Sequence, residues 1–236
     1  MAPQLVKSYV KSNKNDANDA KAICEAVARP IMHFVAVKPI AQQDIQAIHR
    51  VRSELVSHRT AKVNQIRGLL AEYGLAVGRR VEVLRTALLL LLEDAENGLT
   101  LDFRMLLDEL RQDLINLDKG VEVMDKKIKL LVSSHSEAER LLAIPRIGPI
   151  TATAIISAIG NGNGKQFKRG RDFAAWLGLT PRQHSSSGKE RLLGNSKRGD
   201  SYLRTLLIQG ARAVLRVVDQ KRSSESLATK LVQSSQ

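Results

Sequence analysis

Two aspartates near the N-terminus are spaced so that their carboxylates share one side of a helix. Asp16 and Asp19 stand three residues apart in the segment 15–28, where apolar residues recur at helical spacing before Pro30. Mg²⁺ prefers carboxylate oxygens as ligands, so the pair is a candidate for part of a metal site. A purely structural role stays open, because acidic residues in a first turn also interact favourably with the helix dipole. A two-metal site would need further ligands, and none is visible nearby in the sequence.

A second reactive group is the serine run Ser185–Ser187, which precedes Gly188 and Lys189. A serine hydroxyl can attack a phosphodiester when its proton is removed and a cation stabilises the developing charge. Four cations in the same segment could supply that charge: Lys189, Arg191, Lys197 and Arg198. A polar Ser/Gly turn is the alternative interpretation. His184 could be a base, a phosphate contact or an ordinary loop residue.

The residues 141–160 read LLAIPRIGPITATAIISAIG, which predicts two helices joined by a turn that contains Gly148. The pattern resembles a helix-hairpin-helix, in which the amides at the start of the second helix approach a DNA phosphate without reading sequence. An ordinary corner of a helical core is the alternative. The basic segment that follows favours DNA. Further on we expect an apolar helix over 173–179 with Trp176 in the core, a polar basic loop over 182–199, and a helix that begins at Asp200.

Long helices must position these groups. The apolar spacing predicts one helix over 41–73 and another over 103–131, with one short strand over 31–37. Apolar residues in the second long helix alternate steps of four and three, which is typical of a coiled-coil seam. The seam consists of Phe103, Leu107, Leu110, Leu114, Leu117, Val121, Met124, Ile128 and Leu131. Its partner is either the 41–73 helix folded back or another copy of the chain.

Charge is segregated along the 236 residues, whose formal net charge is +13. The net charge is +7 over residues 1–80, −4 over 81–159 and +10 over 160–222. This segregation favours a functional positive field and a polyanionic partner. Only eight residues are Phe, Trp or Tyr, which argues against a protein that binds single strands mainly by base stacking.

Composition also excludes several classes of protein. Cys24 is the sole cysteine, so a disulfide framework and a thiolate metal cage are excluded. The longest apolar run, residues 87–92, is far too short to span a bilayer, and the N-terminus lacks the apolar core of a signal peptide. We therefore expect a cytoplasmic protein.

Together these segments resemble a known family, the bacterial insertion-sequence transposases of the "one-ten" family, related to the Piv/MooV DNA invertases. KSNKNDANDAKAICEAV is similar to the end of their RuvC-like DEDD domain, with the DxxD pair at Asp16 and Asp19. The residues 141–160, followed by FKRGRDFAAWLGLTPRQHSSSGKERLLGNSKRGDSYLRTLLIQGARAVL, are similar to their C-terminal transposase domain. The resemblance covers roughly residues 7 to 228.

The resemblance implies a mainly α protein. It would contain the remnant of an RNase H-like (RuvC-like) domain over 1–40, a coiled-coil helical hairpin over 41–135, a helical transposase domain with a helix-hairpin-helix-like element over 136–222, and a frayed tail over 223–236.

It also implies Mg²⁺ at Asp16 and Asp19, double-stranded DNA as partner, a structured guide RNA in some members, and homo-dimers or tetramers assembled through the coiled coil. A C-terminal serine would become covalently joined to DNA. Counting from Pro181 places that nucleophile at Ser186, whereas counting back from Gly188 places it at Ser187. DNA contacts are expected from Arg146, Gly148, Lys165, Lys168, Arg169, Arg182, Lys189, Arg191, Lys197 and Arg198.

Three departures from the family pattern predict a chain shortened at both ends. No counterpart of the family's first Asp and its Glu precedes Asp16, Arg146 replaces a glycine in the turn, and the last basic helix is incomplete. We therefore expect DNA binding without a serine–DNA adduct from this chain alone. A nucleic-acid-binding remnant without catalysis, or a coiled-coil assembly protein, are the rival classes.

Overall fold

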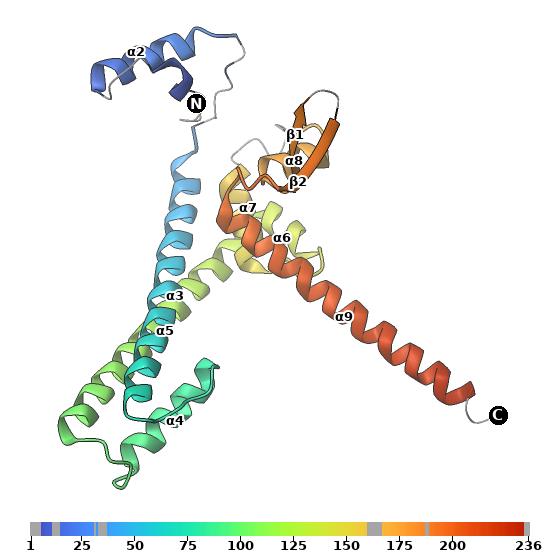
Figure 1. Ribbon diagram of the computed structural model, residues 1–236. Coiled ribbons are helices and arrows are strands. Elements are labelled where there is room, and N and C mark those ends of the chain that lie inside the picture. Colours follow the sequence, from blue (N-terminus) through green and yellow to red (C-terminus); the bar gives the residue numbers. More distant parts are fainter. Residues whose placement is uncertain are drawn as a thin grey trace. The chain divides into compact units, whose positions relative to one another are not determined.

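The computed structural model describes residues 6–10, 15–30, 32, 37–159, 167–186 and 189–233, without the side chains of 184–186, 189–190 and 219–233. The chain divides into two compact units, residues 1–39 and 40–236, which we describe separately (Figure 1). The described residues are mainly helical, which confirms the predicted fold class. Among them, no helix is long and apolar enough to cross a membrane.

The first unit contains η1 (Lys7–Tyr9) and α2 (Asp16–Val27). α2 begins where the sequence predicts, because the side-chain oxygen of Asn15 accepts a hydrogen bond from the Asn18 amide at 2.7 Å. Only the small side chains of Ala22 and Ala26 are buried on this helix. The strand expected over 31–37 lies almost entirely outside the described residues, so the RNase H-like remnant stays a prediction.

The second unit is built on two long helices that lie side by side, α3 (Ile40–Glu72) and α5 (Leu101–Ser133) (Figure 1). Six of the nine predicted seam residues of α5 are buried, and Leu117, Met124 and Leu131 are half-buried. Phe103, Leu107, Leu110 and Leu114 share one core with Val63, Ile66 and Leu70 of α3. The coiled-coil prediction is therefore confirmed as a hairpin within one chain. Val51, an apolar residue of α3, is exposed.

Ion pairs join these two helices along their length. Arg52 pairs with Asp125 at 2.5 Å, Arg59 with Asp118 at 3.4 Å, and Lys62 with Asp113 at 3.0 Å. The partner numbers fall on α5 as they rise on α3, so the helices run antiparallel. The first two pairs are seven residues apart on both helices, which is the heptad repeat of charges flanking a coiled-coil seam.

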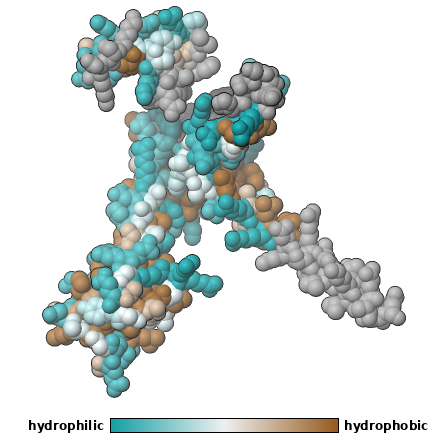
Figure 2. Space-filling model, in the orientation of Figure 1, coloured by the Kyte–Doolittle hydropathy of each residue, from teal (hydrophilic) through white to brown (hydrophobic). Residues whose placement is uncertain are grey.

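The helix α4 (Val81–Glu93) packs on the closed end of this hairpin and was not expected from the sequence. Leu84 and Leu88 are fully buried in a core with Ile66, Leu70 and Leu107. Arg104 ties the end of α4 to α5, because it donates hydrogen bonds to the carbonyl oxygens of Leu91 and Leu92 in the last turn and of Asp94 just after it. Apolar side chains of α4 and α5 remain exposed here, and Figure 2 shows brown surface over this end.

The rest of the unit packs around α7 (Pro149–Ile159), which contacts α3, α5, α6 (Ser136–Leu142) and α9 (Ser201–Gln233). Its small residues allow this close approach on several sides, and most of the helix is buried. The helix α9 continues to Gln233, through most of the residues for which we expected a frayed tail.

Two expectations for this region were wrong. Residues 182–199 are mostly an antiparallel hairpin, β1 (Pro181–Ser186) and β2 (Lys189–Asn195), and not a loop. The strands are mostly polar and lack the apolar alternation from which a strand is predicted. Trp176, at the end of α8 (Gly170–Trp176), is 36% exposed and not a core residue.

Candidate nucleic-acid interface

The turn between α6 and α7 places the predicted helix-hairpin-helix residues at a helix start. Arg146 adopts a φ of 65°, a left-handed conformation in which glycine is favoured. The Ala152 amide donates to the Gly148 carbonyl at 2.9 Å, so the helical bonds begin here and earlier first-turn amides are left without helical partners. A Cβ on Gly210 of α9 would lie 3.1 Å from the Arg146 carbonyl oxygen, so α9 packs closely on the turn.

The base of the β-hairpin is fixed to the end of α8, and the sequence did not indicate this contact. The Ser196 amide donates to the Thr180 carbonyl at 2.8 Å, and the Lys197 amide donates to the Gly178 carbonyl at 3.1 Å. A Cβ on Gly199 would collide with the carbonyl oxygen of Trp176, so the two segments touch through their backbones. Lys197 and Arg198 are thereby held beside the last residues of α8.

Most of the predicted DNA-contacting cations lie around this junction and the turn. Those with described side chains, together with Arg171, are exposed: Arg146, Lys168, Arg169, Arg171, Arg182, Arg191, Lys197 and Arg198. None of them forms an ion pair with another described side chain. On α3, by contrast, acidic residues of α5 neutralise three cations.

The candidate nucleophile lies at the end of this hairpin. The backbone of Ser186 pairs with that of Lys189 across the two strands. The side chains of both residues, and the whole of Ser187, Gly188 and Lys165, lie outside the described part of the chain. The choice between Ser186 and Ser187 therefore stays a prediction.

Asp16 and Asp19 both lie in the first turn of α2, the first exposed and the second half-exposed. The described residues contain no group of three or more His, Cys, Asp or Glu side chains that could hold a metal ion. Two carboxylates of one helix fit a part of a divalent-metal site and not a complete one.

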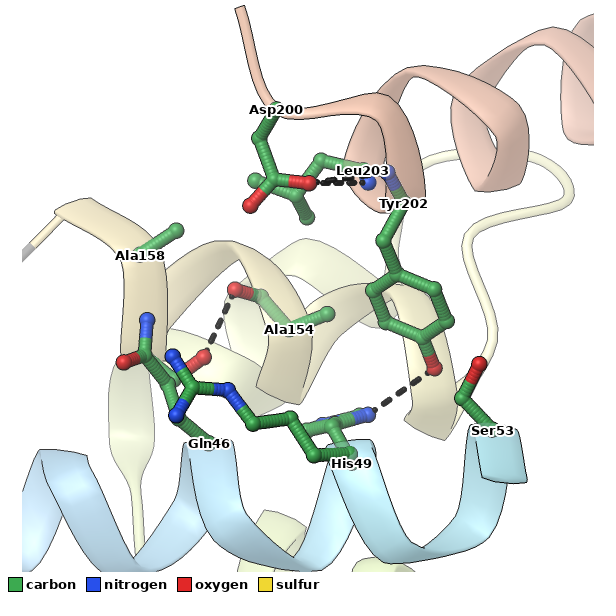
Figure 3. A pocket seen from close by; sticks show the side chains of 10 residues that line it. Gln46, His49, Ser53, Ala154, Ala158, Asp200, Tyr202 and Leu203 are labelled. Atoms are coloured by element: carbon green, nitrogen blue, oxygen red, sulfur yellow. Dashed lines mark hydrogen bonds between the residues drawn. The ribbon is translucent and has the colours of Figure 1, made fainter. Parts of the chain in front are cut away.

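A buried polar cluster joins α3 to α7 and α9, and sequence reasoning missed it. His49 Nε2 lies 3.0 Å from Thr153 Oγ1. On the other side of the ring, Nδ1 lies 3.1 Å from the Tyr202 hydroxyl (Figure 3). The Thr153 hydroxyl lies 2.7 Å from the Pro149 carbonyl, to which it donates its one proton. It must therefore accept from Nε2–H, which leaves Nδ1 to accept from Tyr202. One feature of the sequence could have indicated this cluster: His49 follows Ile45 by four residues and so lies on the same buried face of α3.

Electrostatics keep this cluster neutral. Burial, and after it the positive charge of Arg52, lowers the pKa of His49 from 6.5 to about 4. Burial raises the pKa of Tyr202, and Arg52 opposes that rise. Beside the cluster, a pocket of about 270 Å³ is lined by polar side chains of α3, by Tyr202 of α9 and by Asp200, which precedes α9 (Figure 3). The Asp200 carboxylate caps α9 by accepting from two amides, at 2.8 and 3.1 Å.

Comparisons with known proteins identify the class of the chain. Residues 138–226, which contain the helical turn and the β-hairpin, match the family model described as "Transposase IS116/IS110/IS902 family". Residues 1–75, which contain α2 and α3, match the model of a DEDD transposase. The chain is thus of the transposase class.

Curated relatives give the family. The chain is 49% identical over 227 residues to the "Probable family 20 transposase" of Pseudomonas aeruginosa, with 96% of this chain and 67% of the relative covered. It is 45% identical over 227 residues to the transposase for insertion sequence element IS1111A of Coxiella burnetii, covering 96% and 62%. It is 42% identical over 215 residues to the transposase for IS1328 of Yersinia enterocolitica, covering 91% and 63%. The chain belongs to the IS116/IS110/IS902 transposase family and spans about two thirds of the length of these relatives.

Proposed function

We propose that this chain binds double-stranded DNA through phosphate contacts and takes part in the cleavage and exchange of strands during transposition of an insertion sequence. The observation that carries the proposal is the set of exposed cations around the α6–α7 turn and the α8–hairpin junction, which have no ion-pair partner among the described side chains. Such cations can neutralise phosphates and release their counterions, whereas the paired cations of α3 cannot do so without losing a partner.

Two kinds of contact would hold the duplex. The first-turn amides of α7 and the guanidinium of Arg146 suit a single phosphate at the turn. Arg191 of β2, and Lys197 and Arg198 just after it, suit phosphates further along, because the base of the hairpin is fixed to the end of α8. Neither kind of contact reads base edges, so binding would be largely independent of sequence.

The chemical step that we propose is attack of the Ser186 hydroxyl oxygen on a phosphorus atom of the DNA backbone. A phosphoserine ester forms, the bond to one strand oxygen breaks, and the serine proton leaves to a base or solvent. The family resemblance supports this role, and Ser187 is the alternative nucleophile. Asp16 and Asp19 would contribute two ligands to a Mg²⁺ ion, which stabilises charge on phosphate oxygens when it is bound. Since they form only part of a site, we expect no adduct from this chain alone.

The binding proposal is tested by fluorescence anisotropy of a dye-labelled duplex over a range of salt concentrations. If about six phosphates are neutralised, a plot of log affinity against log salt has a slope near −5. Replacing Lys197 and Arg198 with alanine should make that slope shallower by about 2. A slope near zero for the unaltered chain would overturn the proposal.

A matched control uses Arg79 and Arg80, which are adjacent, exposed and without an ion-pair partner among the described side chains, and which precede α4. Replacing both with alanine removes the same charge far along the chain from the proposed interface. We expect the slope and the affinity to change little. An equal loss in both double variants would show that net charge alone determines binding.

Self-association and RNA binding are separate parts of the proposal, and each has its own support. The predicted homo-dimer or tetramer cannot use the α5 seam as first supposed, because α3 covers it. We propose instead that self-association uses exposed apolar side chains at the closed end of the hairpin, such as Leu101 and Met105. Support for a guide RNA comes from the family resemblance alone.

A further inference from the structure

Three of the chain's eight aromatic residues gather at α8, with one ring partly open to solvent. The Trp176 ring centroid lies 5.5 Å from that of Phe167 and 5.8 Å from that of Phe173, and the two phenylalanine rings are 5.2 Å apart. Phe173 packs against the core that contains Leu177 and Leu203. Trp176, which is 36% exposed, therefore lies against Phe173, a ring that is itself packed in the core.

Positive charge flanks this aromatic cluster at both ends of α8. Lys168, Arg169 and Arg171 lie at the start of the helix, and all three are exposed. Lys197 and Arg198 lie at its end, where Gly199 touches the backbone of Trp176. A helix of seven residues is roughly 10 Å long, so all five cations lie within a few nucleotides' reach of the indole.

We propose that Trp176, supported by Phe167 and Phe173, is a stacking surface for an unpaired base of DNA. This inference rests on the proposed function and adds to it a preference for DNA with interrupted pairing. An aromatic face offers a base a stacking partner of any sequence, and the cations bind the phosphates on either side of that base. A fully paired duplex covers its base faces by stacking, so only its phosphates could use this surface.

Charge argues for this occupant against an apolar protein surface or a second copy of the chain. The segment 168–172 carries three cations and one carboxylate, Asp172. The partner face would therefore have to be apolar at its centre and anionic around it. A second copy of the same basic surface would bring like charges together. An unpaired nucleotide has both features, because its base is a largely apolar ring and the phosphates on either side of it are anionic.

Trp176 is the only tryptophan of the chain, so its fluorescence reports directly on this surface. Two dye-labelled duplexes of the same sequence are compared, one fully paired and one interrupted by a short single-stranded gap. We expect the gapped duplex to quench tryptophan emission strongly and the paired duplex to quench it weakly. Trp176→Ala should weaken binding of the gapped duplex about 5- to 100-fold and leave the paired duplex nearly unchanged.

Two variants separate stacking from loss of structure. Trp176→Phe keeps an aromatic face and should retain most of the affinity for the gapped duplex. Leu130→Ala removes an apolar side chain that is 73% exposed on α5 and should change neither affinity. If Trp176→Ala unfolds, the quenching of the unaltered chain and the Trp176→Phe affinity still decide the matter.

Other outcomes would overturn the inference in distinguishable ways. If anisotropy shows that the gapped duplex binds but tryptophan emission does not change, the stacking inference is wrong and the proposed function still stands. If neither duplex raises the anisotropy, the chain does not bind DNA and the proposed function is wrong as well. A dimer without DNA that Trp176→Ala converts to a monomer would show that a second copy covers the indole.

Discussion

A single buried imidazole shows how one residue connects the helical hairpin to the transposase-like region. His49 is 4% exposed and hydrogen-bonded on both ring nitrogens, to α7 and to α9. Helical periodicity places position 49 on the buried stripe, but it gives no reason for a polar residue there. The reason is the Thr153 and Tyr202 hydroxyls, which come from segments more than a hundred residues away. Contacts of this kind cannot be predicted from local pattern.

The lowered pKa of His49 predicts how stability depends on pH. The unfolded chain binds a proton near pH 6.5 and the folded chain only near pH 4, so protonation favours unfolding between these values. Stability should be complete above pH 6.5 and fall as the pH drops towards 4. The pKa difference corresponds to an upper limit of roughly 3–4 kcal/mol, of which about 2 kcal/mol is lost by pH 5.

Urea unfolding at pH 7.5 and at pH 5 measures this effect. His49→Gln should lower stability at pH 7.5 but remove most of the His49 contribution to the change between the two pH values. The comparison is between pH slopes, because the substitution also disturbs packing. An unaltered slope in His49→Gln would assign the pH dependence to other groups.

At the scale of elements, the long helices could be predicted because one apolar face repeats over many turns. The helix α4 escaped prediction because residues 87–92 are apolar on every side, which hides the helical period. The β-hairpin escaped because its strands are polar and show no period of two. The predicted seam was right in its residues, and the structure decided its partner.

The seam gives a direct test of that partner. Leu114 is 1% exposed between the long helices, so Leu114→Lys should cost several kcal/mol and lower the melting temperature strongly. Leu130→Lys places the same charge on an exposed face of α5 and should cost little. Since the seam partner is α3 of the same chain, neither change should alter the mass at low concentration by light scattering. A halved mass for Leu114→Lys would mean that the seam joins two copies.

The junction of α8 with the hairpin is a second contact between elements that can be tested, because it requires a glycine at position 199. A Cβ at Gly199 collides with the Trp176 carbonyl, so Gly199→Ala should destabilise the protein by about 2 kcal/mol or more. It should also weaken DNA binding, because Lys197 and Arg198 lose their placement. Gly170→Ala is the matched control, since a Cβ there meets nothing within 4 Å. Chemical denaturation and anisotropy measure both effects, and equal behaviour of the two variants would contradict the junction.

For the whole molecule, the structure changes the meaning of the charge segregation. The sequence indicated two basic blocks around an acidic middle, and we interpreted both blocks as a functional field. The acidic residues Asp113, Asp118 and Asp125 instead neutralise cations of α3 through ion pairs in the hairpin. The excess that remains is concentrated in residues 160–222, whose net charge is +10. Electrostatic attraction for DNA should therefore be directed to that region.

If the cations of α3 lose their acidic partners, they should attract DNA as well. Replacing Asp113 and Asp118 with Asn removes the acidic partners of Lys62, Arg59 and Arg85, and it should lower stability by about 1–2 kcal/mol. The same variant should bind duplex DNA more tightly, with a salt slope steeper by about 1–2, because the freed cations can contact phosphates. Replacing Asp102 with Asn and Glu109 with Gln changes the net charge equally but frees no ion-paired cation, so its slope should stay nearly constant. Identical slopes for the two double variants would mean that the ion pairs of the hairpin do not direct DNA to residues 160–222.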